Sequence, residues 1–252
     1  MRYSSLCDTG KLRKINQDNI FCSSDEVGCL PNLYIVADGM GGHNAGELAS
    51  QLSIEYFLVF LREQENQPCD IEMVLNKGIE KVNRLVYNKS LNDPHCQGMG
   101  TTFICATYKM DTQELYVANV GDSRLYAIGQ EIKKVTVDHS LVEEMIKGGE
   151  LTEQEARNHP KKNIITRAVG VESNLTVDTY IVDCKDMTHI LLCSDGLTNM
   201  LDEEEMKKLI DQAGSVEEAC RVLVEEANER GGYDNISVIL IETQKEVGEL
   251  NC

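Results

Sequence analysis

The sequence is poor in basic residues: 24 Lys and Arg stand against 42 Asp and Glu, which gives a formal net charge of -18 at pH 7. A protein that binds the phosphate backbone of a nucleic acid normally presents a basic patch. The charge balance therefore argues against a nucleic-acid partner. It is compatible with divalent cations, and it favours solubility.

Long apolar runs are also missing. No segment approaches the roughly 20 apolar residues of a membrane-spanning helix. Residues 1–14 contain no apolar stretch of the kind that a signal peptide needs. We therefore expect no membrane partner and a cytoplasmic location.

Closely spaced cysteine pairs are absent, although the chain contains ten Cys. There is no C-x-x-C, and no Cys/His cluster has the spacing of zinc ligands. In a cytoplasmic protein such cysteines are mostly reduced thiols, and several of them are buried. We expect this here, with Cys105 and Cys193 buried in strands.

Internal repeats and low-complexity linkers are absent as well. We therefore predict one domain over residues 1–244 and a frayed C-terminal tail at 245–252. A chain of 252 residues is long enough to bury a substantial core.

Four segments have the apolar spacing of amphipathic helices. Asp70 and Asp202 are suited to cap two of them, and Ser215 with Glu218 fits a capping box at a third. Each helix carries one apolar stripe, which should pack on a flat surface. The predicted helices are 45–61, 71–86, 202–212 and 215–229.

Short apolar runs between turn signals predict about ten strands. Those between 102 and 137 follow one another closely, as in an antiparallel meander. Because most connections are hairpins, we predict an α+β fold of two packed antiparallel sheets covered by helices. The predicted strands are 3–9, 18–23, 33–38, 102–108, 114–119, 123–128, 131–137, 176–182, 188–194 and 235–242.

A polar stretch at 138–170 lies between predicted strands. It contains two capping-box patterns on either side of Gly148-Gly149, which predicts two short helices joined by a flexible turn. We expect this insertion to form a surface flap. The two patterns are Ser140 with Glu143 and Thr152 with Glu155.

Four acids, Asp38, Asp122, Asp195 and Asp234, each lie at the edge of an apolar run and near Gly or Asn. A strand end holds a side chain in a fixed position, and glycine lets the backbone bend beside it. We infer that the four acids meet in space. Mg²⁺ and Mn²⁺ prefer oxygen ligands, and two such ions serve in-line displacement at phosphorus.

Within this predicted metal centre, Asp38 is assigned as the carboxylate that two ions share, and Gly39 offers its carbonyl as a ligand. Asp195 and Asp234 complete the set from two other strand ends. Asp122 supports a third, weaker ion.

A cation is needed for the phosphate oxygens. Arg13, in the polar loop before Asp18, is assigned to this task because a guanidinium binds phosphate oxygens in pairs. Arg124 is the competitor, and we expect it to pair with a nearby acid instead.

Other phosphatase motifs fail on inspection. His95-Cys96 is not followed by Arg at the spacing of a cysteine phosphatase, since Thr102 stands there. The segment from Gly121 to Arg124 lacks the His of a Gly-Asp-x-His motif. No Gly-Lys-Ser/Thr sequence of a P-loop exists.

Eight motifs occur in one order from residue 10 to residue 235, and with them the chain resembles bacterial metal-dependent protein phosphatases of the protein phosphatase 2C (PPM) type. The motifs cover nearly the whole chain. They are Gly10-x-x-Arg13-x-x-Asn16-Gln17-Asp18, Ala37-Asp38-Gly39-Met40-Gly41-Gly42-His43, Gly100-Thr101-Thr102, Ala118-Asn119-Val120-Gly121-Asp122-Ser123-Arg124, Asp138-His139-Ser140, Ile165-Thr166-Arg167-Ala168-Val169-Gly170, Cys193-Ser194-Asp195-Gly196-Leu197 and Gly232-x-Asp234-Asn235.

The resemblance implies a four-layer αββα sandwich with a flap that touches substrate. It implies hydrolysis of phosphoserine and phosphothreonine by a metal-activated water, with two core Mn²⁺ or Mg²⁺ ions and a third at Asp122. It also implies the metal roles of Asp38, Gly39, Asp195 and Asp234, and it makes Arg13 the phosphate-binding arginine. Asp18 would orient waters around the metals. Expected partners are phosphorylated proteins and a cognate cytosolic kinase, and we expect a monomer.

Three positions depart from the pattern of the animal members. Met40 replaces a His proposed there as the general acid, so this chain lacks that acid. Gln17 replaces a common Glu, and Ser237 replaces a frequent Thr. His43 is expected to hydrogen-bond locally at a helix start rather than to act as an acid or base.

Three rival functions remain open from the sequence. They are an inactive regulator that only binds phosphoproteins, a nuclease or phosphodiesterase, and a structural Ca²⁺ site. The complete acid set argues against the first, and the negative charge argues against the second.

Overall fold

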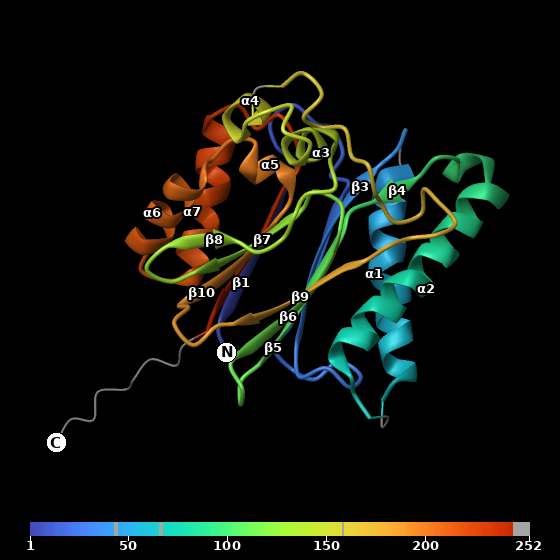
Figure 1. The fold of residues 1–252 in the computed structure, drawn as a ribbon, viewed down its shortest axis with the longest axis horizontal. Coiled ribbons are helices and arrows are strands. Elements are labelled where there is room, and N and C mark those ends of the chain that lie inside the picture. Colours follow the sequence, from blue (N-terminus) through green and yellow to red (C-terminus); the bar gives the residue numbers. More distant parts are fainter. Residues whose placement is uncertain (43–44, 66–67, 158, 244–252) are drawn as a thin grey trace.

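The computed structural model describes residues 1–42, 45–65, 68–157 and 159–243. Two antiparallel sheets pack face to face, and a pair of helices covers the outer face of each (Figure 1). The predicted α+β fold of two packed antiparallel sheets is therefore confirmed. His43 and the predicted tail at 245–252 lie outside the described residues.

The first sheet has the strand order β1-β11-β10-β7-β8, and the second has the order β2-β3-β5-β6-β9 with the short β4 beside β3. Every neighbouring pair is antiparallel. The strands are β1 Tyr3–Asp8, β2 Asp18–Ser23, β3 Leu33–Met40, β4 Gly100–Thr101, β5 Phe103–Lys109, β6 Glu114–Val120, β7 Arg124–Ile128, β8 Ile132–Lys134, β9 Asp178–Asp183, β10 His189–Cys193 and β11 Ile236–Glu242.

Four long helices form the outer layers. Helices α1 (Ala45–Glu63) and α2 (Ile71–Asn92) cover the second sheet, and α6 (Glu203–Gln212) and α7 (Val216–Glu229) cover the first (Figure 1). Three apolar clusters hold the layers together, one under each helix pair and one between the sheets. In the part of the chain that the structure describes, no helix is long and apolar enough to cross a membrane.

The predicted helix caps are largely confirmed. Asp70 accepts a hydrogen bond from Met73 N, and Asp202 forms a complete capping box with Glu205. The capping box predicted for Ser215 is incomplete, because Glu218 accepts from the backbone N–H of Gly214 instead of that of Ser215.

The meander predicted between residues 102 and 137 is wrong in one respect. Strands β5 and β6 pair, and β7 and β8 pair, but β6 and β7 belong to different sheets. The chain crosses between the sheets at Gly121, whose φ of 108° is accessible mainly to glycine. This crossing brings Asp122 to the seam between the two sheets.

The segment predicted as a flap contains two short helices, α3 (Leu141–Lys147) and α4 (Glu153–Arg157). Ser140 caps α3, and Thr152 exchanges hydrogen bonds with Glu155 at the start of α4. With the unpredicted α5 (Asp195–Thr198), these helices lie at one end of the sandwich, at the top of Figure 1.

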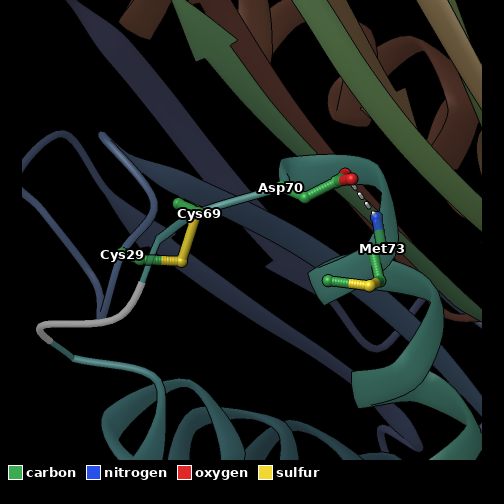
Figure 2. The surroundings of a disulfide bond; sticks show 4 residues. All are labelled: Cys29, Cys69, Asp70 and Met73. Atoms are coloured by element: carbon green, nitrogen blue, oxygen red, sulfur yellow. Dashed lines mark hydrogen bonds between the residues drawn. A yellow bond between two sulfur atoms is a disulfide. The ribbon is translucent and has the colours of Figure 1, made fainter.

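A disulfide joins Cys29 to Cys69, and it corrects the expectation of reduced thiols for this pair (Figure 2). The two residues are 40 apart in sequence, and only the fold brings them together. Seven other cysteines in the described residues are free, as expected. The bond fastens the segment before α2, next to the Asp70 cap, to the turn before β3.

Replacing Cys29 with Ser should lower the free energy of unfolding of the oxidised protein by about 4 kcal/mol, because the bond closes a loop in the unfolded chain. The melting temperature should fall by roughly 10 °C. Thermal denaturation with and without reductant measures this. Reductant should not alter the melting of Cys29→Ser, and a free-thiol control, Cys22→Ser, should respond to reductant as wild type does. Equal melting temperatures of oxidised wild type and Cys29→Ser would contradict the prediction.

Candidate active site

The backbone of Asp38 is held from both neighbouring strands. Asp38 lies opposite Asp18 in the pairing of β2 with β3. Its N–H donates to Thr102 Oγ1 at 2.9 Å, and its carbonyl accepts from Thr102 N at 2.8 Å and from Thr101 Oγ1 at 2.9 Å. The Gly-Thr-Thr motif thus fixes the main chain of Asp38, as a shared metal ligand requires.

Gly39 lies against the first turn of α1. A Cβ at this position would come within 2.1 Å of the carbonyl oxygen of Gly46, so no side chain fits. The N–H of Gly39 donates to Gln17 O at 3.1 Å. Close packing of β3 on α1 therefore requires the glycine, whatever its carbonyl binds.

Asp18 is buried beneath Asp38. Its Oδ2 accepts hydrogen bonds from the hydroxyls of Ser194 and Ser237, each at 2.8 Å. Ser237, which replaces a Thr frequent in the phosphatases that the sequence resembles, has the hydroxyl that this bond needs. Asp18 Oδ1 has no hydrogen-bond partner among the described residues.

Asp195 and Asp234 flank neighbouring strands of the first sheet, at the end of β10 and the start of β11. Asn199 Nδ2 donates to Asp195 Oδ2 at 3.0 Å. Arg13 Nη2 donates to Asp234 Oδ2 at 2.7 Å, across 221 residues of sequence. The fold thus places the predicted phosphate-binding arginine directly beside a predicted metal ligand.

Asp122 lies at the crossing between the sheets and is 7% exposed. Ser123 Oγ, next to it in sequence, lies 2.7 Å from the same Thr102 Oγ1 that binds Asp38 N. Arg124 forms a forked ion pair with Asp138, with its Nη2 at 2.6 Å and its Nε at 2.9 Å from Oδ2. The prediction that Arg124 pairs with a nearby acid is confirmed.

The carboxylates repel one another electrostatically. Burial raises the pKa of Asp38 well above its usual range, and the charges of Asp18, Asp195, Asp122 and Asp234 raise it further. Burial, together with Asp122 and Asp234, raises the pKa of Asp195 in the same way. Such mutual effects operate only at short range. The acids therefore lie within electrostatic range of one another, and their convergence on metal ions stays a prediction.

Two further carboxyls titrate near neutrality. The pKa of Asp18 is raised to about 6, mainly by burial. The pKa of Asp122 is raised to about 7 by burial and then by the charge of Asp138, against the opposing charge of Arg124. A cluster of this kind is stable only when it takes up protons or cations.

The donor set fits a hard divalent cation. Asp18 Oδ1, Asp122 Oδ1 and Asp195 Oδ1 are buried carboxylate oxygens without a hydrogen-bond partner among the described residues. Across residues 1–42, 45–65, 68–157 and 159–243, no three His, Cys, Asp or Glu side chains are already grouped as ligands of one ion. Mg²⁺ typically keeps several waters and takes only one or two carboxylates, so it does not require three grouped side chains.

A groove of about 1440 Å³ is lined by Asp122 and Asp195 and by residues of the flap helices α3 and α4 and of α6. Arg157 on α4 and Glu203 on α6, which both line it, form an ion pair of 2.8 Å. Two of the predicted metal ligands therefore lie in the wall of a groove next to the flap.

Several supporting residues were not predicted from the sequence. Ser194 and Thr102 each bind a site acid, or its backbone, from another element, and Asn199, the C-cap of α5, binds Asp195 in the same helix. Ser194 and Thr102 lie inside motifs that were recognised in the sequence, so their place in those motifs was a signal of a role at the site. Asn199 follows Asp195 by one helical turn in α5, which was not predicted.

Residues 12–229 match the family model described as protein phosphatase 2C. The serine/threonine phosphatase stp of Listeria monocytogenes is 40% identical over 246 residues, covering 94% of this chain and 95% of that protein. Protein phosphatase PhpP of Streptococcus pneumoniae is 35% identical over 251 residues, covering 99% and 100%. The chain belongs to the protein phosphatase 2C family.

Solved structures agree with this assignment. The serine/threonine phosphatase of S. agalactiae has a TM-score of 0.88 at 35% identity, covering 96% of this chain and 99% of that one. The Mycobacterium tuberculosis serine/threonine phosphatase PstP/Ppp has a TM-score of 0.84 at 29% identity, covering 97% and 99%. Both similarities extend over nearly the whole chain, so the fold as a whole is shared with these phosphatases.

Proposed function

We propose that this chain is a metal-dependent protein phosphatase that hydrolyses phosphoserine and phosphothreonine in proteins. The observation that carries the proposal is the set of buried carboxylate oxygens without a partner among the described residues, on Asp18, Asp122 and Asp195, two of which line the groove. Arg13 lies beside a further acid, Asp234. Family membership supports the same activity.

Asp38, Asp195 and Asp234, with the carbonyl of Gly39, would hold two Mn²⁺ or Mg²⁺ ions. Asp122 and Asp195 would hold a third. Bound ions of this kind supply Lewis acidity, which lowers the pKa of water and stabilises charge on phosphate oxygens.

The residues of this chain position the reactants. In the reaction, water attacks the phosphorus in line, the bond from phosphorus to the serine or threonine oxygen breaks, and inorganic phosphate leaves. Arg13 is 48% exposed in its side chain and can turn from Asp234 toward the phosphate oxygens. Asp18, held by Ser194 and Ser237, orients water beside Asp38. Met40 has no proton to give, so the departing oxygen takes its proton from water.

The groove suits a protein substrate better than a small ester. A phosphorylated side chain would reach the acids from the groove, while the flanking chain would lie between α6 and the flap. We further propose a cytoplasmic, monomeric enzyme over residues 1–244 that reverses a serine/threonine kinase, since a phosphoprotein phosphatase requires a kinase that makes its substrates.

Phosphate release from a phosphothreonine peptide in the presence of Mn²⁺ tests the proposal. The same assay on Arg13→Ala tests the proposed role of Arg13 in binding phosphate. Loss of this guanidinium should lower kcat/KM by about a hundredfold, because one preorganised donor to the phosphate is removed. Arg221→Ala, which removes an exposed arginine on α7, is the matched control and should retain full activity.

Three outcomes would count against the proposal. Peptide binding without turnover, with bound metal confirmed, would favour the phosphoprotein-binding regulator. Faster cleavage of a phosphodiester than of the phosphopeptide would favour a different metallohydrolase. Activity that chelator does not remove would exclude the metal-dependent mechanism.

A further inference from the structure

His139 makes two hydrogen bonds to Gly121, the residue before Asp122. The N–H of His139 donates to Gly121 O at 3.0 Å, and Nδ1 of its ring accepts from Gly121 N at 3.0 Å. The backbone N–H and the carbonyl of Gly121 are therefore both bound by a single histidine. His139 itself is only 6% exposed.

The ring of His139 has a defined orientation and tautomer. A peptide N–H can only donate, so Nδ1 accepts and the neutral ring carries its proton on Nε2. Nε2 lies 3.1 Å from Asp178 Oδ2 and 2.9 Å from Arg167 Nη1. Because a guanidinium can only donate, the carboxylate is the acceptor for the Nε2 proton. Arg167 Nη1 donates to Asp178 Oδ1 at 2.6 Å and thereby holds the carboxylate in place.

Gly121 determines where Asp122 points. Its φ of 108° is a conformation that side chains rarely adopt, and a Cβ there would lie 2.6 Å from Thr102 Cβ. A backbone in this region rotates easily unless its peptide groups are bound. The two bonds from His139 remove this freedom, immediately before a carboxylate with an unpartnered buried oxygen.

We propose that His139 is a positioning residue for Asp122, acting through the peptide N–H of Gly121, with Asp178 and Arg167 orienting its ring. It touches neither metal nor substrate. This inference depends on the proposed function only in taking Asp122 as a ligand of the third ion.

Three substitutions of His139 distinguish the contribution of Nδ1, which binds Gly121, from that of Nε2, which faces Asp178. In His139→Asn, the side-chain oxygen takes the place of Nδ1 and can still accept from Gly121. In His139→Gln, the amide takes the place of Nε2 and can reach Asp178, but the acceptor for Gly121 is lost. His139→Ala loses both.

Mn²⁺ binding to the wild-type and variant proteins can be measured without catalysis, from the electron paramagnetic resonance signal of free Mn²⁺ during a titration. We expect His139→Gln and His139→Ala to weaken the Asp122-dependent site about tenfold, the usual effect of losing a residue that orients a ligand. His139→Asn should stay close to wild type. His189→Ala, which removes a half-buried imidazole at the far end of β10, controls for a general loss of packing.

The reference variant is Asp122→Asn, which should lose the site. In the Asp122→Asn protein, His139→Gln should cause no further change, because a residue that acts through another adds nothing once its target is gone. Independent, additive effects would overturn the proposal. So would equal weakening by Asn and Gln, which is the pattern of a merely structural role. If His139→Ala does not fold, the comparison of His139→Asn with His139→Gln still tests the proposal.

Failure of the inference and failure of the proposed function give different results. If Asp122→Asn loses a site while His139→Gln titrates as wild type, only the role of His139 is refuted. If Asp122→Asn binds Mn²⁺ as wild type does, the assignment of Asp122 is wrong and the inference falls with it. Phosphopeptide hydrolysis can survive either result.

Discussion

Asp38→Asn should abolish phosphate release and at the same time raise the melting temperature of the metal-free protein. The amide cannot serve as a shared anionic ligand, and loss of several kcal/mol of transition-state stabilisation corresponds to about a thousandfold lower kcat. Without metal, however, the substitution removes a carboxyl whose ionisation is opposed by burial and by the charges of Asp18, Asp195, Asp122 and Asp234, and with it the free-energy cost of keeping that carboxyl protonated in the folded chain. Activity and stability should therefore change in opposite directions.

Phosphopeptide hydrolysis with Mn²⁺, and thermal denaturation after chelation, give the two measurements. Asp186→Asn is the matched control, because it makes the same chemical change at an exposed carboxylate in the turn before β10, at the opposite end of that strand from Asp195. It should alter neither quantity appreciably. A metal-free Asp38→Asn protein that melts below wild type would show that Asp38 has a stabilising partner, and the account of the cluster as mutually repulsive would then be wrong.

Local signals in the sequence predicted most of the fold. Helix periodicity and caps located the outer layers, and Asp70 and Asp202 do cap α2 and α6. These features depend on residues within about four positions of one another, so a sequence pattern records them directly. The strands at residues 3–8 and 18–23 were predicted for the same reason.

Sheet order could not be predicted in this way. The strands on either side of Gly121 are close in sequence, and a meander was the simplest interpretation, yet they belong to different sheets. A strand pattern specifies which face is apolar, but it does not specify the partner strand. The disulfide between Cys29 and Cys69 escaped prediction for the same reason, since its residues meet only after α1 packs on the sheet.

In the candidate site, as in the fold, local features were predicted from the sequence and contacts between distant segments were not. The four acids at strand edges were named from the sequence, and the charges of Asp122, Asp195 and Asp234 each act on Asp38 in the folded chain, so the four lie within electrostatic range. The bonds that hold them come from distant elements: Ser194 to Asp18 spans 176 residues and Arg13 to Asp234 spans 221. No local pattern encodes such contacts.

The stability of the metal-free protein should fall as pH rises from about 4 to about 7. The pKa of Asp18 is raised to about 6 and that of Asp122 to about 7, so the folded chain binds more protons than the unfolded chain in this range. When the folded state binds more protons, the free energy of unfolding decreases with increasing pH. At about 1.4 kcal/mol for each pKa unit, the two groups together account for a loss of several kcal/mol.

Urea denaturation of chelated protein between pH 5 and pH 8 measures this slope. His139 and His189, whose pKa values are lowered mainly by burial, act in the opposite direction below about pH 6.5. The decisive quantity is therefore the difference between wild type and Asp122→Asn, in which the histidine contributions cancel. The wild type should lose more stability than the variant as pH rises through 7.

Saturating Mn²⁺ should remove this slope, because a cation neutralises the same oxygens that protons occupy at low pH. Protons and metal then compete, and the apparent affinity for Mn²⁺ should fall as pH drops below about 7, where Asp122 takes up its proton. If wild type and Asp122→Asn showed the same pH dependence without metal, the carboxyl of Asp122 would not be protonated in the folded chain. The metal-free cluster would then have to be stabilised by something other than protons.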